Sequence, residues 1–403
     1  MRGALTLFAL ALLSGGAFAA DSVGQKYSFS PNSLAQPHAT PPAAVIAHTT
    51  PRPDGVVPSV PAGFTAAPFA TGLSNPRWMA IAPNGDVFLT EPNAGKITVL
   101  RDADSDGKAE TFSTYASGFD RVHGIAFHDS ALYVADVKAV WKFPYKDGDL
   151  TTAAKPERVT VDEFGGDSDH WSRDIVFDKD GALYVAIGSG ANVEEGEPAT
   201  RASVQRVTAD GHLTPFATGI RNPVGIAFYP GTSDLYVSVN ERDLLGDDLV
   251  PDYLTQIHQG DFLGWPYAYI GSHPDPDFGA KRPDLVAKTK TPDVLFESHS
   301  AALGLVFYEG AQFPASYKGD AFVALHGSWD RATPTGYKVV RVHFKNGRPE
   351  NAYENFATGF WDGASKPAKV WGRPAGLVVA KDGALLIADD AGKTVWRVSY
   401  KGK

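Results

Sequence analysis

Short apolar strands alternate with turns along most of this 403-residue chain, and the alternation repeats six times. In each repeat a charged, imidazole or amide side chain stands just ahead of an apolar strand, and a turn and a second strand follow. The six segments begin at Asn75, Arg121, His170, Arg221, His299 and Arg373. Recurrence of a strand–turn–strand unit at intervals of tens of residues is typical of a radial β-propeller. The pattern predicts an all-β fold, a six-bladed β-propeller with a central channel.

The same spacing predicts a binding site. The innermost strands of a propeller all start at one mouth of its channel, so the six leading side chains should surround one cavity. Because the second strand of each repeat runs antiparallel to the first, its end returns to that mouth. We therefore expect Arg221 and Asn222 to lie beside Asn240 and Glu241.

The repeats divide the chain into three parts. They fill residues 63–403, which we expect to form one catalytic domain. Residues 20–62 include eight prolines between Pro31 and Pro61, a composition that favours an extended strap or linker. Residues 1–19 combine Arg2 with an apolar run and a small-residue exit, as in a secretory signal peptide. This predicts a periplasmic or secreted protein without a membrane span, and the absence of cysteine excludes disulfides.

The charge of the chain and its distribution limit the kinds of ligand that the cavity could bind. The net charge of -9 argues against a nucleic-acid partner. Several positive residues nevertheless occupy the repeated position at the channel mouth, which favours a small anionic ligand. The alternative is that each arginine pairs with a neighbouring aspartate.

Two acidic stretches could hold a metal ion. Asp247, Asp248 and Asp252 follow Glu241 and supply the hard oxygen ligands that calcium prefers, although a solvated loop is an equal alternative. The stretch from Asp102 to Asp106 matches the first half of an EF-hand loop. Its twelfth position is Ser113, so a turn joining two blades is the favoured interpretation.

His170 is a candidate general base. A lone histidine is usually structural, but this one occupies the same position in its repeat as Arg221 and Arg373. Either Asp167 or Asp169 could orient the imidazole or adjust its basicity.

The fifth and sixth repeats add an aromatic and cationic group. Trp329 stands between His326 and Arg331, and an aromatic ring beside an arginine can hold a planar anion. Packing in the core is the alternative for Trp329. Lys366 and Lys369 precede Arg373. The chain carries no P-loop, dinucleotide fingerprint, nucleophile elbow or zinc motif, so redox chemistry would need another cofactor.

Taken together, these motifs resemble the soluble quinoprotein glucose and sorbosone dehydrogenases, most closely the sorbosone-dehydrogenase-like branch. The resemblance covers about residues 63–400. It rests on residues 221–228, 240–253, 326–331, 334–341 and 373–377.

The resemblance implies a six-bladed propeller that binds pyrroloquinoline quinone (PQQ) and calcium and oxidises an aldose, a ketoaldose or a related aldehyde. It implies that His170 is the base and that Arg221 also serves catalysis. The implied quinone-binding residues are Arg221, Asn222, His326, Trp329, Arg331, Arg373 and His123. The implied calcium ligands are Asn240, Glu241 and Arg242, partly through backbone carbonyls, with Asp247, Asp248 and Asp252 nearer a second calcium.

Two departures from the glucose-oxidising members make glucose itself a doubtful substrate. Ser189 stands where those members have an aspartate that supports the base, and His326 replaces a lysine near the cofactor.

The electron acceptor is not identified by the sequence. Two other classes stay open, a calcium-dependent lactonase-type propeller hydrolase and a non-catalytic ligand-binding propeller.

Overall fold

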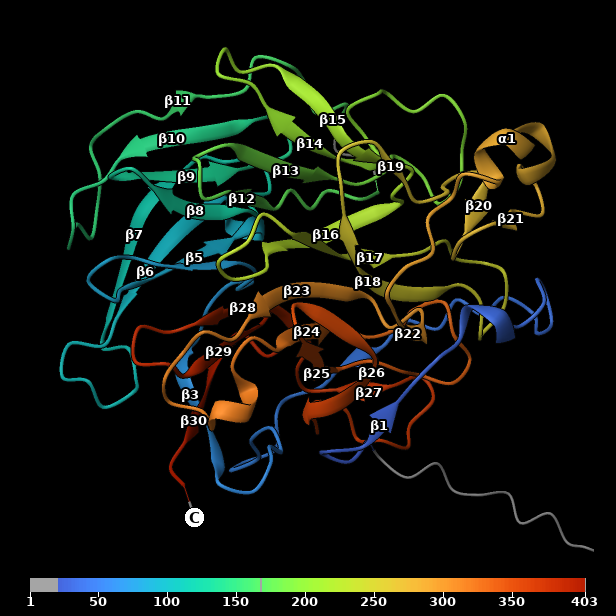
Figure 1. The fold of residues 1–403 in the computed structure, drawn as a ribbon. Coiled ribbons are helices and arrows are strands. Elements are labelled where there is room, and N and C mark those ends of the chain that lie inside the picture. The colour runs from blue at the N-terminus through green and yellow to red at the C-terminus, as the bar shows by residue number, and fades with distance from the viewer. Residues whose placement is uncertain (1–20, 167–168, 403) are drawn as a thin grey trace, which may run out of the picture.

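The computed structural model describes residues 21–166 and 169–402. Six antiparallel sheets are arranged radially around one axis, with turns and loops between them (Figure 1). The one α-helix in these residues, α1 (Pro283–Val286), is a single turn. The prediction of an all-β, six-bladed β-propeller is confirmed. The predicted signal peptide, residues 1–19, lies outside the described residues, and so does Asp167.

The first three blades each run outward from a short inner strand. The first contains β4 (Met79–Ile81), β5 (Val87–Glu91), β6 (Lys96–Arg101) and β7 (Thr111–Ser117). The second contains β8 (Ile125–His128), β9 (Ala131–Ala135), β10 (Val140–Pro144) and β11 (Glu157–Arg158). The third contains β12 (Ile175–Phe177), β13 (Leu183–Ile187), β14 (Ser203–Val207), β15 (Leu213–Thr218) and the added parallel strand β19 (Asp261–Phe262).

The last three blades have longer inner strands. The fourth contains β16 (Asn222–Phe228), β17 (Leu235–Asn240), β18 (Pro251–Ile257) and β22 (Val294–Ser298). The fifth contains β23 (Ala302–Phe307), β24 (Ala321–Leu325), β25 (Lys338–Lys345), β26 (Arg348–Ala357) and β1 (Lys26–Tyr27). The sixth contains β28 (Pro374–Val379), β29 (Leu385–Asp389), β30 (Thr394–Tyr400) and β3 (Phe64–Thr71).

Smaller elements decorate this frame. They are β2 (His48–Thr49) paired with β27 (Lys369–Val370), the hairpin β20 (Ala268–Tyr269) and β21 (His273–Pro274), and the 3-10 turns η1 (Pro31–Ser33), η2 (Pro92–Ala94), η3 (Gly279–Lys281) and η4 (Ala315–Tyr317).

The inner strands touch one another around the axis, and β28 of the last blade touches β4 of the first. Glycine in the repeated motif permits this approach. A Cβ atom at Gly376 would lie 2.2 Å from the carbonyl oxygen of Arg77, and one at Gly225 would lie 2.4 Å from that of Leu303. Only a residue without a side chain fits there. The glycines therefore keep the ring narrow enough for the strand starts to form one site.

The ring closes through the N-terminal part of the chain. Strand β3 forms the outer edge of the sixth blade, where Phe64 lies opposite Tyr400 at the end of β30. An early segment and a late segment thus share one sheet (Figure 1). Ring closure of this kind leaves few unpaired strand edges.

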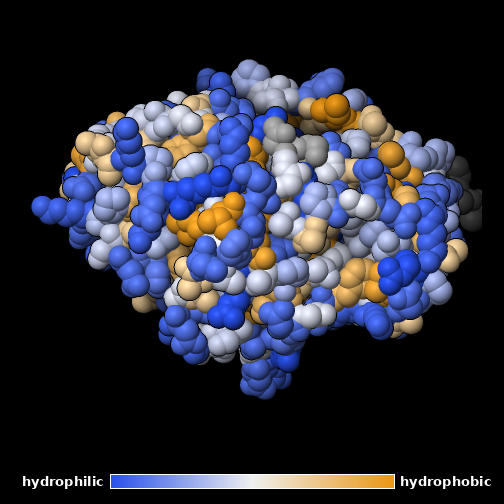
Figure 2. Space-filling view, turned by 90° about the horizontal axis from the view of Figure 1, so that it is seen from above, coloured by the Kyte–Doolittle hydropathy of each residue, from blue (hydrophilic) through white to orange (hydrophobic). Residues whose placement is uncertain are grey.

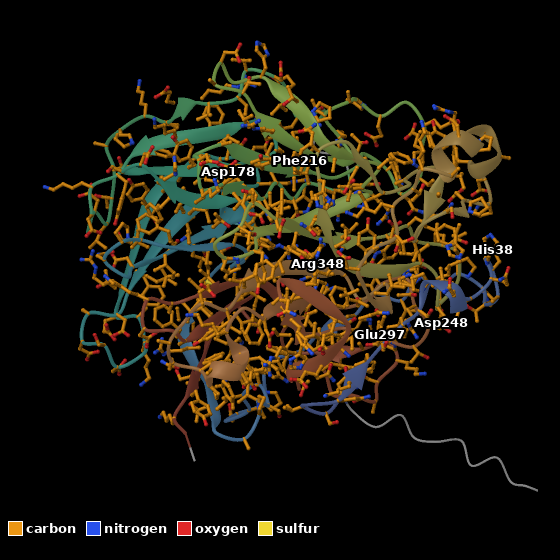
Figure 3. The ribbon with its side chains drawn as sticks, in the orientation of Figure 1. His38, Asp178, Phe216, Asp248, Glu297 and Arg348 are labelled. Atoms are coloured by element: carbon orange, nitrogen blue, oxygen red, sulfur yellow. The ribbon has the colours of Figure 1, made fainter. Side chains whose placement is uncertain are left out.

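The proline-rich strap crosses the same end of the propeller as the strand starts. β2 runs parallel to β27, and Ala44 forms an isolated bridge with Asp330. The amide of Val45 donates to the carbonyl oxygen of Trp329 at 2.6 Å. Figure 3 places His38, at the beginning of this crossing, near Asp248 at the edge of the molecule.

The core lies between neighbouring blades. The second strand of most blades is buried along its whole length, as in β5, β9, β13, β24 and β29. The outer surface is largely hydrophilic, with apolar residues scattered over it (Figure 2). Within residues 21–166 and 169–402, no helix is long and apolar enough to cross a membrane.

Candidate active site

A cavity of about 620 Å³ opens where the inner strands begin. Eleven of the residues proposed from the sequence line it, from the third to the sixth blade. They are Asp169, His170, Arg221, Asn222, Asn240, Glu241, Asp252, His299, His326, Trp329 and Arg373. The predicted convergence of segments far apart in sequence is thus a feature of the structure.

His170 lies five residues ahead of β12, in the third blade. Its Nδ1 atom lies 2.9 Å from both the carbonyl oxygen and the hydroxyl oxygen of Ser189. A carbonyl oxygen can only accept, so Nδ1 carries the proton and Nε2 carries the lone pair. Burial, reinforced by the Arg221 charge, lowers the pKa of His170 to about 3. The imidazole is neutral at ordinary pH and can accept a proton.

Gly188 makes room for this imidazole. A Cβ atom there would lie 2.5 Å from the Cβ of His170 and 2.6 Å from Oδ1 of Asn222. The glycine that ends the second strand of the third blade therefore lets the base and the start of the fourth blade meet.

Arg221 joins three segments of the rim. Its guanidinium donates to Oδ2 of Asp243 at 2.6 Å, to the carbonyl oxygen of Glu241 at 2.5 Å and to Oδ1 of Asn192 at 2.9 Å. It also approaches the carbonyl oxygen of Asn240 at 3.4 Å. The two carbonyls that the sequence suggested as calcium ligands thus accept hydrogen bonds from Arg221.

Arg373 is held differently. Its guanidinium donates to the backbone carbonyl oxygens of His326 and Gly327 at 3.1 Å and 2.9 Å. Within the described ranges it forms no ion pair with a carboxylate, whereas Arg77 pairs with Asp390 at 2.5 Å. The Arg373 charge is therefore the least neutralised of the three arginines in the cavity wall, and it is the best placed to hold an anion.

His326 shares a carboxylate with Arg77. Its Nε2 atom lies 2.9 Å from Oδ1 of Asp390. Burial, together with the Arg373 charge, lowers the pKa of His326 to about 4. Although burial alone would raise the pKa of Asp390, His326 and Arg77 hold it well below its usual range. His326 is thus a neutral hydrogen-bonding group beside an ionised carboxylate.

Two indole rings flank the cavity. Trp329 is 43% exposed and lines the mouth together with Ile46 of the strap, so its side chain is not a core residue. Trp171 also lines the wall, and the guanidinium carbon of Arg77 lies 5.4 Å from the centre of its ring. These rings offer flat apolar faces beside cationic groups.

A group of oxygen atoms lies on the fourth-blade side. Glu241 is 3% exposed, and its Oε1 has no hydrogen-bond partner among the described residues. Oδ1 of Asn222 is likewise buried without a partner in that part of the chain. Burial raises the pKa of Glu241 to about 7 and that of Asp252 to about 6. Buried oxygens that lack donors are suited to a hard cation such as calcium.

The remaining predicted site residues do not line the cavity. The Arg242 guanidinium turns outward to Asp275 and Asp277 of the segment around β21. Arg331 pairs with Asp248 at 2.8 Å. The carboxylate of Asp247 accepts from the Ala332 and Thr333 amides. These residues belong to loops beyond the strand ends, where side-chain direction is set by loop contacts and not by strand alternation.

Two further expectations are corrected by the structure. Asp247 and Asp248 do not join Asp252 in a second calcium site, because Asp252 faces inward and accepts from the Glu241 and Ala301 amides. His123 is fully buried and packs 4.2 Å from the Trp78 ring, so it supports the wall from behind. Burial lowers the pKa of His123 well below its usual value.

The acidic loop between β6 and β7 has one more member than the sequence suggested. Asp102, Asp104, Asp106 and Glu110 bring one oxygen each within 4.8 Å of one another. Ser113 lies in β7, so the twelfth EF-hand position is part of a strand. The sequence suggested that this turn joins two blades, and that expectation is wrong, because the loop joins the paired strands β6 and β7 of the first blade.

Several lining residues were not proposed from the sequence. They are Arg77, Trp171, Asn192, Asp243 and Ala301, with Asp390 just behind the wall. Arg77 stands in the repeated motif, and that signal could have identified it. Asp169 lines the cavity, but Nδ1 of His170 is held by Ser189 and not by this carboxylate. Asp390 and Asn192 lie in loops whose spacing differs from blade to blade, so no periodic signal marks them.

The chain is similar to several known proteins. The sequence model of a family described as TrAA12-like matches residues 58–260 and 282–401. An uncharacterized protein of Borreliella burgdorferi is 28% identical over 358 residues, covering 85% of this chain and 90% of that protein. A pyrroloquinoline quinone-dependent pyranose dehydrogenase of Coprinopsis cinerea is 24% identical over 338 residues. That alignment covers 70% of this chain and 44% of the dehydrogenase, less than half of its length.

Solved structures share the fold. The holo PQQ domain of the Coprinopsis cinerea pyranose dehydrogenase has a TM-score of 0.72 at 19% identity, covering 87% of this chain and 98% of that domain. A calcium structure of the Trichoderma reesei carbohydrate-active enzyme of family AA12 has a TM-score of 0.70 at 20% identity, covering 85% and 97%. The PQQ-bound aldose sugar dehydrogenase of Streptomyces coelicolor has a TM-score of 0.59 at 18% identity, covering 85% and 99%.

Proposed function

Because the chain belongs to the TrAA12-like family, we propose that it is a PQQ- and calcium-dependent dehydrogenase of an aldose, a ketoaldose or a related aldehyde. The observation that carries the proposal is the pairing, in one cavity, of a neutral His170 with an Arg373 that forms no ion pair with a carboxylate of the described residues. The PQQ dependence named for the pyranose dehydrogenase relative supports it.

The cavity suits the quinone in shape and charge. PQQ is a flat tricarboxylate, so it needs cations at its edge and an apolar face. Arg373 would hold one carboxylate directly, and Arg77 would add positive charge across the cavity, tempered by Asp390. Trp329 and Trp171 provide the flat faces. Arg331, which pairs with Asp248 outside the cavity, is left out of this assignment.

Calcium would be held by side-chain oxygens of Glu241, Asn222 and Asn240. Two of these residues bring a buried oxygen that lacks a donor, and all three line the cavity. This set differs from the backbone-carbonyl set suggested by the sequence, since Arg221 occupies the carbonyls of Asn240 and Glu241. When bound, the quinone supplies the hydride acceptor and the calcium supplies Lewis acidity.

The protein's own residues supply proton removal and orientation. Nε2 of His170 would take the proton of an anomeric hydroxyl or of a hydrated aldehyde as the carbon loses hydride. Ser189 keeps the proton on Nδ1, and Arg221 fixes the rim on which the base and the oxygen ligands meet. Trp329 and Ile46 at the mouth would cover the apolar face of a sugar and limit the entry of water.

A calcium-dependent lactonase is the second candidate. The oxygen set of Glu241, Asn222 and Asn240 would also suit a metal that activates water. Three arginines in the same wall disfavour it, because they lower the affinity for a cation and attract an anion. The lactonase interpretation also gives no role to the guanidinium of Arg373, which donates only to backbone carbonyl oxygens among the described residues.

The proposal extends to location and organisation. The signal-peptide pattern of residues 1–19 favours an exported protein, in which residues 63–403 form the catalytic propeller and residues 20–62 a strap. The electron acceptor would approach from the cavity mouth, the one side where the quinone would be reachable.

A dye-reduction assay tests the proposal. Purified protein is given a panel of aldoses, ketoaldoses and aldehydes, with and without PQQ and calcium. We expect reduction only when both are present, and lactone hydrolysis in neither case. Hydrolysis of a lactone with calcium alone, and no dye reduction with any sugar, would establish the second candidate instead.

A further inference from the structure

A buried cluster in the wall of the cavity contains two carboxylates and an imidazole. Asp243 follows β17, His299 precedes β23, and Asp330 follows β24. Their exposed fractions are 6%, 5% and 1%. One potential ligand atom from each lies within 4.8 Å of the other two. Three separate segments thus bring metal-binding side chains to one buried point.

The hydrogen bonds of His299 leave no positive charge between its Nδ1 atom and the two carboxylates. Its Nε2 lies 2.9 Å from the carbonyl oxygen of Gly246, which can only accept, so Nε2 carries a proton. Its Nδ1 lies 3.3 Å from Oδ1 of Asp243 and 4.0 Å from Oδ2 of Asp330. In a neutral imidazole the Nδ1 lone pair would face these carboxylates directly. Either a second proton or a metal ion must lie between them.

Asp330 distinguishes these possibilities. Its Oδ2 accepts from the Leu244 amide at 2.5 Å, but Oδ1 is buried and accepts no hydrogen bond of ordinary length and angle among the described residues. The Ala43 amide is near enough to act on this carboxylate without satisfying Oδ1. A proton on Nδ1 would reach Oδ1 of Asp243 at 3.3 Å, whereas Oδ2 of Asp330, at 4.0 Å, lies beyond hydrogen-bond distance. A metal ion has enough coordination positions to engage all three side chains.

We propose that Asp243, His299 and Asp330 form a binding site for a divalent transition-metal ion such as zinc or manganese. One imidazole nitrogen with two carboxylate oxygens suits these metals, whereas calcium rarely takes nitrogen ligands. Two carboxylates balance a divalent charge, and the nearest guanidinium, Arg221, is directed at the other oxygen of Asp243. None of these three residues belongs to the group proposed to hold calcium, which consists of Glu241, Asn222 and Asn240.

The position of this metal gives it a structural role. Asp330 forms a backbone bridge with Ala44 of the strap, and Asp243 holds the guanidinium of Arg221. A bound ion would therefore tie the strap, the fourth blade and the fifth blade together at the cavity mouth. Residues 21–57 of the strap lie outside the part matched by the family model.

Metal analysis of the full-length protein tests the site without quinone or sugar. The protein is stripped with a chelator, loaded with zinc or manganese, freed of excess metal and analysed by mass spectrometry. We expect about one tightly bound ion per chain, and a loss of affinity of roughly tenfold or more in Asp330→Asn and in His299→Gln. The matched control is Asp106→Asn in the exposed acidic loop, which should retain the ion. No bound ion in the wild-type protein, or equal binding in Asp330→Asn, would overturn the proposal.

Nitrogen-15 NMR of the histidine rings provides a second measurement that does not require the variants to fold. In the zinc-loaded wild-type protein, the metal-bound Nδ1 should lose the signature of a protonated nitrogen while Nε2 keeps it. A doubly protonated imidazolium at His299 in the presence of zinc would mean that a proton occupies the position, and the metal site would be rejected.

Discussion

Ser189 supports His170 through a hydroxyl group and a carbonyl oxygen, both 2.9 Å from Nδ1, and brings no charge. The hydrogen of the Ser189 hydroxyl is itself directed to the carbonyl oxygen of Ala191 at 2.7 Å, so this hydroxyl can only accept from the imidazole. Two acceptors thus fix the tautomer. Neither acceptor is ionised. The Ser189 carbonyl oxygen favours the protonated ring, but burial and the Arg221 charge outweigh it and lower the pKa of the base.

The first prediction concerns the pH dependence of the reconstituted enzyme. A base with a pKa of about 3 is already deprotonated at pH 5, so kcat/KM should show no loss from imidazole protonation near pH 6.5. Ser189→Asp should raise the pKa of His170, since a carboxylate favours the charged ring. The acidic limb of the profile should then shift upward by about one unit or more. A wild-type limb near pH 6.5 would contradict the neutral, buried base.

The second prediction concerns the anion anchor. Arg373→Ala should weaken PQQ binding by about ten- to a hundredfold, because it removes charge-assisted hydrogen bonds from the cavity wall. Arg331→Ala is the matched control, since that guanidinium pairs with Asp248 outside the cavity. Titration of the stripped protein with PQQ, followed by absorbance, measures both. Equal losses in the two variants would show that position in the cavity does not matter.

The third prediction concerns Glu241. Glu241→Gln should weaken calcium binding roughly tenfold or more, because it removes the negative charge of a buried carboxylate whose Oε1 has no donor among the described residues. Asp248→Asn, exposed and outside the cavity, should leave calcium binding unchanged. Calorimetry with calcium in the presence of PQQ gives the two affinities.

Glu241→Gln should weaken calcium binding but raise the free energy of unfolding. Because the folded-state pKa of Glu241 is raised to about 7, the native state holds its proton more tightly than the unfolded chain does. The resulting loss in the free energy of unfolding is absent below the pKa that Glu241 has in the unfolded chain. It is fully present above pH 7. Without calcium at pH 8, Glu241→Gln should therefore stabilise the fold by about 1–3 kcal/mol, as measured by urea unfolding. A destabilised variant would show that the carboxylate is paired in the native state.

The fourth prediction separates binding from packing at Trp329. This side chain is 43% exposed, so Trp329→Ala should change the free energy of unfolding by less than about 1 kcal/mol. It should nevertheless weaken binding of the quinone or the sugar by about tenfold, while Trp329→Phe keeps most of the affinity. A large loss of stability with unchanged ligand binding would make Trp329 a core residue after all.

The sequence repeats were enough to predict the ring of blades, because the two innermost strands of each blade are formed by residues of a single repeat. Each repeat carries its own strands, turn and glycine, and Gly225 and Gly376 stand where the next blade approaches. The strap was recognised by its prolines, but its path depends on contacts such as that of Ala44 with Asp330, which lie far apart in sequence. Composition contains no information on those contacts.

The candidate site was predictable where it follows the strands. His170, Arg221 and Arg373 keep the position set by the repeat, and all three line the cavity. Arg331 and Arg242 lie beyond the strand ends, and each forms an ion pair with a carboxylate of a neighbouring loop. The alternative that arginines pair with nearby aspartates therefore holds for these two and, within the cavity wall, for Arg221 with Asp243. No sequence rule decides which arginine finds such a partner.

The most direct test of the central claim is a single turnover of quinone-loaded protein with an aldose and no external acceptor, followed by the absorbance of the quinone. His170→Asn keeps a donor toward Ser189 but lacks the basic nitrogen. We expect the wild-type protein to reduce its quinone, and the variant to bind the quinone normally while reducing it at least about a hundredfold more slowly. Equal rates of reduction in the two proteins would contradict the account.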